Sequence, residues 1–187
     1  MRQVRTNVFE TNSSSTHSIA IPRNGGTPNY ISFHIGEFGW SFEEVDAADY
    51  FYTAIYAVSD TMAEAEEKLA KLKDILDDYN IEADFEEVDC EEYNGWLSIE
   101  DGYIDHGDEL KDFVEELLNN GDKLVRFLDG GLVFTGNDNS YTEERCFIER
   151  NEEFLHGYDW STRQSFKIKN PYYMSDHDDY EWYWKGN

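Results

Sequence analysis

The stretch that does most to define the fold is residues 61–79, which read TMAEAEEKLAKLKDILDDY. Thr61 and Glu64 have the spacing of a helix capping box, whose side chains bond the free backbone N–H groups of the first helical turn. Apolar residues then recur at alternating steps of three and four, which places them on one face of a helix. They are Met62, Ala65, Leu69, Leu72, Leu76 and Tyr79. The pattern predicts a helix whose apolar stripe packs into a core and does not form a cofactor site.

Helices and strands are predicted on both sides of this stretch. Upstream, residues 45–58 are predicted to form a helix. Before it, strands 16–21 and 30–35 are predicted to form a hairpin. Downstream, the sequence predicts strands at 81–85 and 96–99, followed by a helix capped by Asp108 and ended by Gly121. A hairpin of strands 123–128 and 132–135 is predicted next. The last predicted elements are a helix over 142–155 and a strand over 165–169. Because strands and helices come in pairs rather than in strict alternation, the fold class expected is α+β. We expect a single domain, residues 1–187, with an antiparallel or mixed sheet covered by helices, and residues 170–187 as a candidate acidic and aromatic C-terminal appendage.

The charge of the chain is strongly negative and unevenly distributed. Its 187 residues include 41 acidic and 15 basic side chains, a formal net charge of −26. Between residues 77 and 116 there are 17 acidic residues and one base, Lys111. The densest run holds Asp84, Glu86, Glu87, Asp89, Glu91 and Glu92. Such a run is either a solvated face or a surface that docks on a cationic partner, and its charge argues against binding free nucleic acid or an anionic membrane.

Cysteine usage and hydropathy point to the cytoplasm. Cys90 and Cys146 are 56 positions apart, which builds neither a disulfide framework nor a metal knuckle. The first ten residues lack the apolar region of a secretory signal, and the longest nearly apolar run, residues 50–58, is too short to span a bilayer. We therefore expect a cytoplasmic protein with no membrane contact.

The first segment with candidate chemistry is residues 10–17, ETNSSSTH, which combine a carboxylate, several hydroxyls and an imidazole. If a strand begins there, His17 lies on the same face as Ile19 and Ile21. Two interpretations stay open. His17 is either a buried histidine with an internal hydrogen bond, or an acid or base that serves catalysis.

Two further segments could contribute to the same chemistry. Asp105 and His106 stand directly before a predicted helix, whose free N–H groups attract anions, although Asp108 could simply cap that helix. Asp138, within the sequence GNDN, could coordinate a hard cation such as Mg²⁺ or form an Asx turn. If these residues met Glu10 and His17 in space, the site would suit phosphodiester cleavage by imidazole acid/base chemistry or by a metal-activated water.

The opening block, residues 5–19, reads RTNVFETNSSSTHSI and resembles a family of proteins from bacteriophages and mobile elements of Firmicutes. Residues 103–106 and 135–139 also resemble family segments, so that matched blocks cover most of residues 5–140. This family is similar to some type II-A anti-CRISPR proteins, including one that disarms the Cas nuclease by truncating its guide RNA. The resemblance implies a counter-defence role but carries over no catalytic residue.

Together these observations predict a phage-encoded anti-CRISPR protein in the host-cell cytoplasm. It would inhibit a type II RNA-guided Cas nuclease by docking acidic surface, residues 84–92, onto the basic channels of that nuclease and its guide RNA. Whether it also acts as a ribonuclease on the guide is left open, and the alternatives are a non-catalytic DNA mimic and a stand-alone hydrolase. In the catalytic version, His17 and His106 form the acid/base pair, Glu10, Asp105 and Asp138 orient groups or bind a divalent metal, and Asn12, Ser13, Ser14 and Ser15 contact phosphate.

Overall fold

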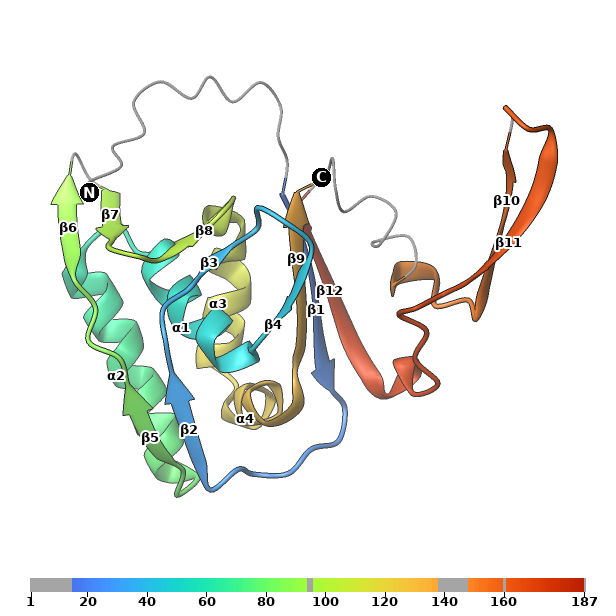
Figure 1. Cartoon of the computed structure of the whole chain (residues 1–187). Coiled ribbons are helices and arrows are strands. Elements are labelled where there is room, and N and C mark those ends of the chain that lie inside the picture. The colour runs from blue at the N-terminus through green and yellow to red at the C-terminus, as the bar shows by residue number, and fades with distance from the viewer. Residues whose placement is uncertain (1–14, 94–95, 138–147, 160, 187) are drawn as a thin grey trace.

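The computed structural model describes residues 15–93, 96–137, 148–159 and 161–186 (Figure 1). A four-stranded antiparallel sheet of order β12-β1-β9-β4 lies at its centre. Its strands are β1 (Ser15–Pro22), β4 (Glu43–Val45), β9 (Leu132–Asn137) and β12 (Tyr180–Gly186). β1 is paired along both edges, which makes it an interior strand of this sheet.

Helices lie on one side of the sheet (Figure 1). They are α1 (Ala47–Ala57), α2 (Met62–Asp78), α3 (Lys111–Leu118) and α4 (Gly121–Gly130). Of these, α2 packs on the outside of α1 and α3. The side chains of Asp46, Thr61 and Asn120 accept hydrogen bonds from backbone N–H groups of the first turns of α1, α2 and α4. These caps satisfy donors that a helix start leaves without intrahelical partners. Ile19 and Ile21 of β1 pack with the buried faces of the helices in the main core.

The opposite face of the sheet carries a second, aromatic cluster. Phe134 is buried there, and partly buried side chains of Phe42, Tyr172, Trp182 and Trp184 pack against it. The Trp182 and Trp184 rings stack with centroids 5.2 Å apart and an interplanar angle of 8°. Since Trp182 and Trp184 belong to β12, the C-terminal segment takes part in the central sheet by backbone pairing and by side-chain packing.

Four two-stranded pairs surround this centre. Two pairs are parallel, β2 (Tyr30–Phe33) with β5 (Glu82–Phe85) and β3 (Glu37–Phe38) with β8 (Tyr103–Ile104). Two are antiparallel, β6 (Cys90–Tyr93) with β7 (Trp96–Ile99) and β10 (Phe154–Asp159) with β11 (Gln164–Lys169). Short 3-10 turns, η1 (Gly107–Leu110) and η2 (His177–Asp179), precede α3 and β12. The predicted α+β class, with antiparallel and parallel pairing and helical cover, is confirmed.

A buried lysine connects three elements in the second half of the chain, α3, α4 and β12. Lys123 of α4 is 6% exposed, and its Nζ lies 2.7 Å from Glu116 Oε1 and 2.9 Å from Glu181 Oε1. It also donates to the hydroxyl of Tyr183 on β12. Burial lowers the pKa of Lys123, but the hydrogen bonds to its three partners together raise that pKa above its usual value. The charged cluster thus connects α3, α4 and the edge strand β12.

The predicted helices over 45–58 and from Thr61 are confirmed as α1 and α2, and the strands at 96–99 and 165–169 as β7 and β11. One member of the buried face of α2 was missed. Lys68 is 7% exposed, because it reaches Ser59 Oγ at 3.2 Å and also bonds the Glu64 carboxylate. A lysine with two such partners can lie in a core that its charge alone would disfavour.

The predicted hairpin of strands 16–21 and 30–35 is wrong. β1 pairs with β9 and β12, so neither of its edges is available to β2, which pairs in parallel with β5 instead. The Gly/Pro cluster between the strands marks a turn, but it does not choose the partner of each strand.

Several predictions for residues 108–155 are also wrong. The N-cap of α3 is Leu110, because the chain enters this helix through η1, and Asp108 therefore does not cap it. Gly121 begins α4 rather than ending a helix, and residues 123–128 are helical because the Asn120 side chain caps a new helix there. The Gly131 N–H bonds Phe127 O at 2.7 Å, so the glycine pair closes this helix and makes no hairpin turn. Of the predicted helix 142–155, residues 142–147 lie outside the described residues, 148–150 are helical, and 154–155 already belong to β10.

Candidate functional site

His17 lies on the helix-covered face of β1 and is 2% exposed. Its Nε2 is 2.9 Å from the backbone oxygen of Asp105, and its Nδ1 is 3.0 Å from the hydroxyl of Tyr50. Because a carbonyl oxygen only accepts, Nε2 carries the proton and Nδ1 accepts from the Tyr50 hydroxyl. The imidazole therefore joins β1 to α1 and to the segment after β8. The buried-histidine interpretation describes this geometry.

Burial lowers the pKa of His17 to about 4, although the Asp105 carbonyl and carboxylate oppose that shift. The charge of His106 lowers the pKa further. His17 is consequently neutral at neutral pH, and burial also raises the pKa of the Tyr50 hydroxyl. A neutral, buried imidazole bonded through both nitrogens suits a positioning role better than proton transfer to a substrate.

Asp105 and His106 follow β8 directly and differ in exposure. Asp105 is 2% exposed, and its Oδ1 accepts from the hydroxyl of Tyr103 at 2.9 Å. The His106 side chain is 35% exposed, and its Nδ1 lies 3.7 Å from Glu109 Oε1. The backbone of His106 has φ 55°, a left-handed conformation that is uncommon for a residue with a side chain. Of the two predicted acid/base histidines, His106 is the one that a substrate could reach.

An aromatic pair and a cavity lie beside His106. The Trp40 and Tyr103 rings stack with centroids 5.8 Å apart at 25°, and the two residues are 41% and 40% exposed. The neighbouring cavity of about 290 Å³ is lined by Ala57, Leu97, Ser98, Ile99, Gly102, Tyr103, Ile104, His106 and Gly107. A Cβ on Gly107 would come within 2.9 Å of the Ala57 Cβ, so glycine permits close packing at this wall. The arrangement offers an imidazole beside an apolar hollow and an exposed stacking surface.

Trp40 and Tyr50 belong to this region but were not among the candidate residues predicted from the sequence. Trp40 stands between Gly39 and Ser41, where a large aromatic residue in a polar stretch is a weak signal of exposed function. Nothing in the sequence connects it with Tyr103, which lies 63 positions away. In the sequence, Tyr50 is an ordinary apolar position of the predicted helix, and only the tertiary structure shows its hydrogen bond to His17.

The predicted acidic docking face is exposed. Asp84 lies on β5, Glu91 and Glu92 lie on β6, and these strands follow one another alongside α2 (Figure 1). All six residues of this acidic face, Asp84, Glu86, Glu87, Asp89, Glu91 and Glu92, are exposed.

Two of these carboxylates also have structural roles. Glu86 Oε2 accepts from the Ile35 N–H at 2.8 Å, and Glu92 Oε1 accepts from the N–H of Met62, the first residue of α2, at 2.7 Å. These bonds tie the acidic face to the strand β2 region and to the start of α2. Substitutions that probe docking should therefore leave Glu86 and Glu92 intact.

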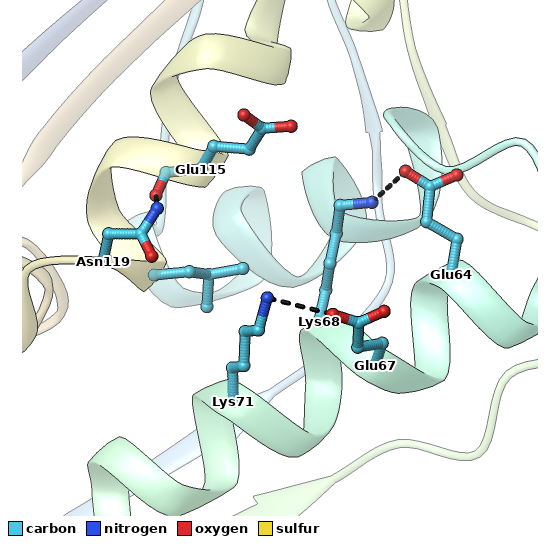
Figure 2. A pocket seen from close by; sticks show the side chains of 7 residues that line it. Glu64, Glu67, Lys68, Lys71, Glu115 and Asn119 are labelled. Atoms are coloured by element: carbon cyan, nitrogen blue, oxygen red, sulfur yellow. Dashed lines mark hydrogen bonds and ion pairs between the residues drawn. The ribbon is translucent and has the colours of Figure 1, made fainter.

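A second cavity, of about 260 Å³, lies between α2 and α3 (Figure 2). Lys68 and Lys71 point into it, but each is bonded to a glutamate four residues earlier on α2, Glu64 and Glu67 respectively. Glu115 adds a further carboxylate from α3. Because both lysines are already paired, this cavity offers little net attraction for an anion.

The predicted residues Glu10, Asn12, Ser13, Ser14 and Asp138 lie outside the described residues. Ser15 begins β1 and is the register partner of Asn137, while His17 contacts Asp105. The described parts of the three polar segments are residues 15–17, 105–106 and 136–137. They therefore lie near one end of β1.

No group of three or more His, Cys, Asp or Glu side chains within the described ranges could hold a metal ion. The predicted metal ligand, Asp138, is not part of those ranges. None of the helices that the structure describes is both long enough and apolar enough to cross a membrane.

Comparisons with protein-family models, curated proteins and solved structures give no match for this chain. The resemblance to phage and anti-CRISPR proteins therefore stays a prediction.

Proposed function

We propose that the protein is a counter-defence inhibitor that docks its acidic face onto the cationic nucleic-acid channel of a type II RNA-guided Cas nuclease. The observation that supports this most directly is the exposure of all six acidic residues on consecutive strands and their connection. A channel that holds a guide–target heteroduplex is strongly basic, so it attracts a surface of this kind. The protein would act in the host-cell cytoplasm, on the effector with its guide RNA and not on free nucleic acid.

The electrostatics favour docking over independent RNA binding. With a net charge of −26, the free protein repels a polyphosphate, whereas a basic channel gains from every carboxylate that approaches it. Binding of this kind depends on salt, because exposed charges are screened over about 10 Å at 0.1 M ionic strength. The non-catalytic mode agrees with the burial of His17 and with its neutral state.

Truncation of the guide RNA is a second candidate, favoured by one observation. His106 is partly exposed at a cavity beside the stacked pair of Trp40 and Tyr103, where an RNA base could stack. In this mode His106 would transfer a proton at the phosphodiester, with Glu109 adjacent to its Nδ1. His17 would act by holding the Asp105 segment in place.

One experiment separates the two modes. The effector–guide complex is incubated with the protein, its DNA binding is measured, and the guide is then run on a denaturing gel. Intact guide with lost DNA binding supports the docking mode, and shortened guide supports cleavage. Retained DNA binding together with an intact guide would refute both.

Charge reversal tests the docking face directly. The variant E87K/D89K/E91K should bind the effector at least tenfold more weakly, by about 1.4 kcal/mol, and should lose part of the salt dependence. D176K/D178K/D179K changes the net charge equally at three exposed residues in and next to η2, on the far side of the central sheet in Figure 1. Equal weakening by both variants would show a general charge effect and would move the contact away from the acidic face.

A further inference from the structure

Strands β10 and β11, called the arm below, stand away from the rest of the described chain (Figure 1). Among the described residues they pair only with each other. Every residue of β11 is exposed. A two-stranded hairpin alone is marginally stable in water, so this arm would gain stability from a surface that covers it.

The arm has one apolar and one cationic face. Phe166 and Ile168 are 43% and 48% exposed, and they alternate along β11 with Lys167 and Lys169. Lys167 Nζ lies 3.7 Å from the centroid of the Phe154 ring on β10, which places both on the cationic face. In a chain of net charge −26, the β11 half of the arm is locally basic. Residues 161–169 contain Arg163, Lys167 and Lys169 and no acidic residue.

A matching edge exists on β5. This strand pairs with β2 along one side, and in the described part of the chain no strand pairs with its other side. The N–H groups of Glu82 and Glu86 donate to residues of the β2 segment, so the N–H groups of Ala83 and Phe85 between them point to the opposite side. β5 therefore presents backbone donors and acceptors at an open edge.

A groove of about 690 Å³ lies between α2 and this strand. Its apolar residues are Leu76, Ile81, Ala83 and Phe85, and Asp77 and Glu82 add carboxylates to its lining. Lys73 of α2 adds one cation, whose Nζ lies 5.0 Å from the centroid of the Phe85 ring. Along β5, the exposed Glu82 and Asp84 alternate with the half-buried Ala83 and Phe85. The edge thus has the same period of two as β11, with acidic residues in place of the lysines.

We propose that β11 of one copy pairs with the open edge of β5 in a second copy of this chain. The pairing would extend the β2–β5 pair into a four-stranded sheet of order β2-β5-β11-β10, by strand addition. In this arrangement Lys167 and Lys169 face Glu82 and Asp84, while Phe166 and Ile168 pack beside Ala83 and Phe85. Opposite charges and apolar pairs across neighbouring strands are each stabilising.

The arm and β5 lie at opposite sides of the molecule (Figure 1). A contact between them joins two different surfaces of the two copies, and such head-to-tail contacts form chains or rings rather than a fixed dimer. Each added copy leaves one free arm and one free edge, so association should rise steadily with protein concentration. Repulsion between copies of charge −26 opposes the contact. The inference does not rest on the proposed function, although the contact would cover Asp84 of the acidic face.

The test is sedimentation velocity of the full chain over a wide concentration series. K167E/K169E should raise the apparent dissociation constant about tenfold, because two attractive pairs become repulsive. E82K/D84K should have a similar effect, although it lowers the net charge that keeps copies apart. The combined variant, with all four reversals, should restore association. K71E/K111E carries the same charge change as K167E/K169E at exposed lysines outside the arm and should leave the constant nearly unchanged.

Circular dichroism and urea unfolding establish that each variant is folded before its association is compared. A native chain that stays monomeric at every concentration overturns the proposal. Association that survives both double reversals, or that fails to recover in the combined variant, also overturns it. If the native chain is monomeric but binds a short single-stranded RNA, and K167E/K169E abolishes that binding, the occupant of the arm is nucleic acid and not a second copy.

Discussion

Replacement of His17 by Gln should remove a pH-dependent part of the stability of this protein. Gln can donate to the Asp105 carbonyl and accept from the Tyr50 hydroxyl, as the imidazole does, but it does not titrate. In the native protein, burial lowers the pKa of His17 from 6.5 to about 4, against the opposing effect of Asp105 and with the help of His106. The folded state therefore binds fewer protons than the unfolded state between these two pKa values.

The sign of the effect follows from linkage. The contribution of His17 is present above its unfolded pKa of 6.5 and is lost as the pH falls towards the folded pKa near 4. Over the whole interval the loss amounts to about 3 kcal/mol. Between pH 7.5 and 5.5 it amounts to about 1.3 kcal/mol, because only part of the interval is crossed. The lower pH is chosen well above the pI of about 4.2, where the chain would lose solubility.

The assay is urea denaturation of the native chain and H17Q at the two pH values. The many carboxylates contribute their own pH dependence to both proteins, so the quantity of interest is the difference between the two pH effects. We expect the native protein to lose about 1.3 kcal/mol more than H17Q on going from pH 7.5 to 5.5. Parallel pH profiles, or an NMR titration that places the pKa of His17 near 6.5, would refute the assignment of a buried neutral imidazole.

Three further substitutions, one of them with a control, test particular contacts. Lys123→Met removes the cation that bonds partners on α3 and β12, and urea denaturation should show that the free energy of unfolding falls by about 2 kcal/mol. Its control, Lys71→Met, breaks only an exposed ion pair and should lower that free energy by less than about 0.5 kcal/mol. Equal losses in the two variants would contradict the reasoning. Tyr50→Phe removes the donor to His17 and should cost about 1–2 kcal/mol in the same assay, whereas unchanged stability would show that this bond contributes nothing. His106→Ala should leave the unfolding free energy within about 0.5 kcal/mol, as expected for a partly exposed side chain. On the denaturing gel it should slow any guide cleavage by about 10²-fold, and cleavage at the native rate would exclude His106.

Features that depend on near neighbours in the chain were predictable. The start of α2 follows from Thr61 and Glu64, whose contacts span three or four residues. The strand β11 follows from the alternation of its side chains. The exposure of the six acidic residues between positions 84 and 92 agrees with a run too charged to be buried without partners.

Features that depend on partners distant in the chain were not predictable from the sequence. The partners of β1, the helical state of residues 123–128 and the burial of Lys68 were all missed. Local turn signals and glycines are compatible with a hairpin or with a helix end, and packing decides between them.

By itself, the sequence determined the charge of this protein, the cap of α2 and part of the candidate site, namely His17, Asp105 and His106. Only the tertiary structure decided that His17 and Asp105, 88 positions apart, meet through a backbone carbonyl, and that His106 rather than His17 reaches solvent. It also placed the open edge of β5 and the basic arm at opposite sides of the molecule. The physical reason is that caps and side-chain periodicity are set within a few residues, whereas burial, strand pairing and pKa depend on groups that the fold brings from far along the chain.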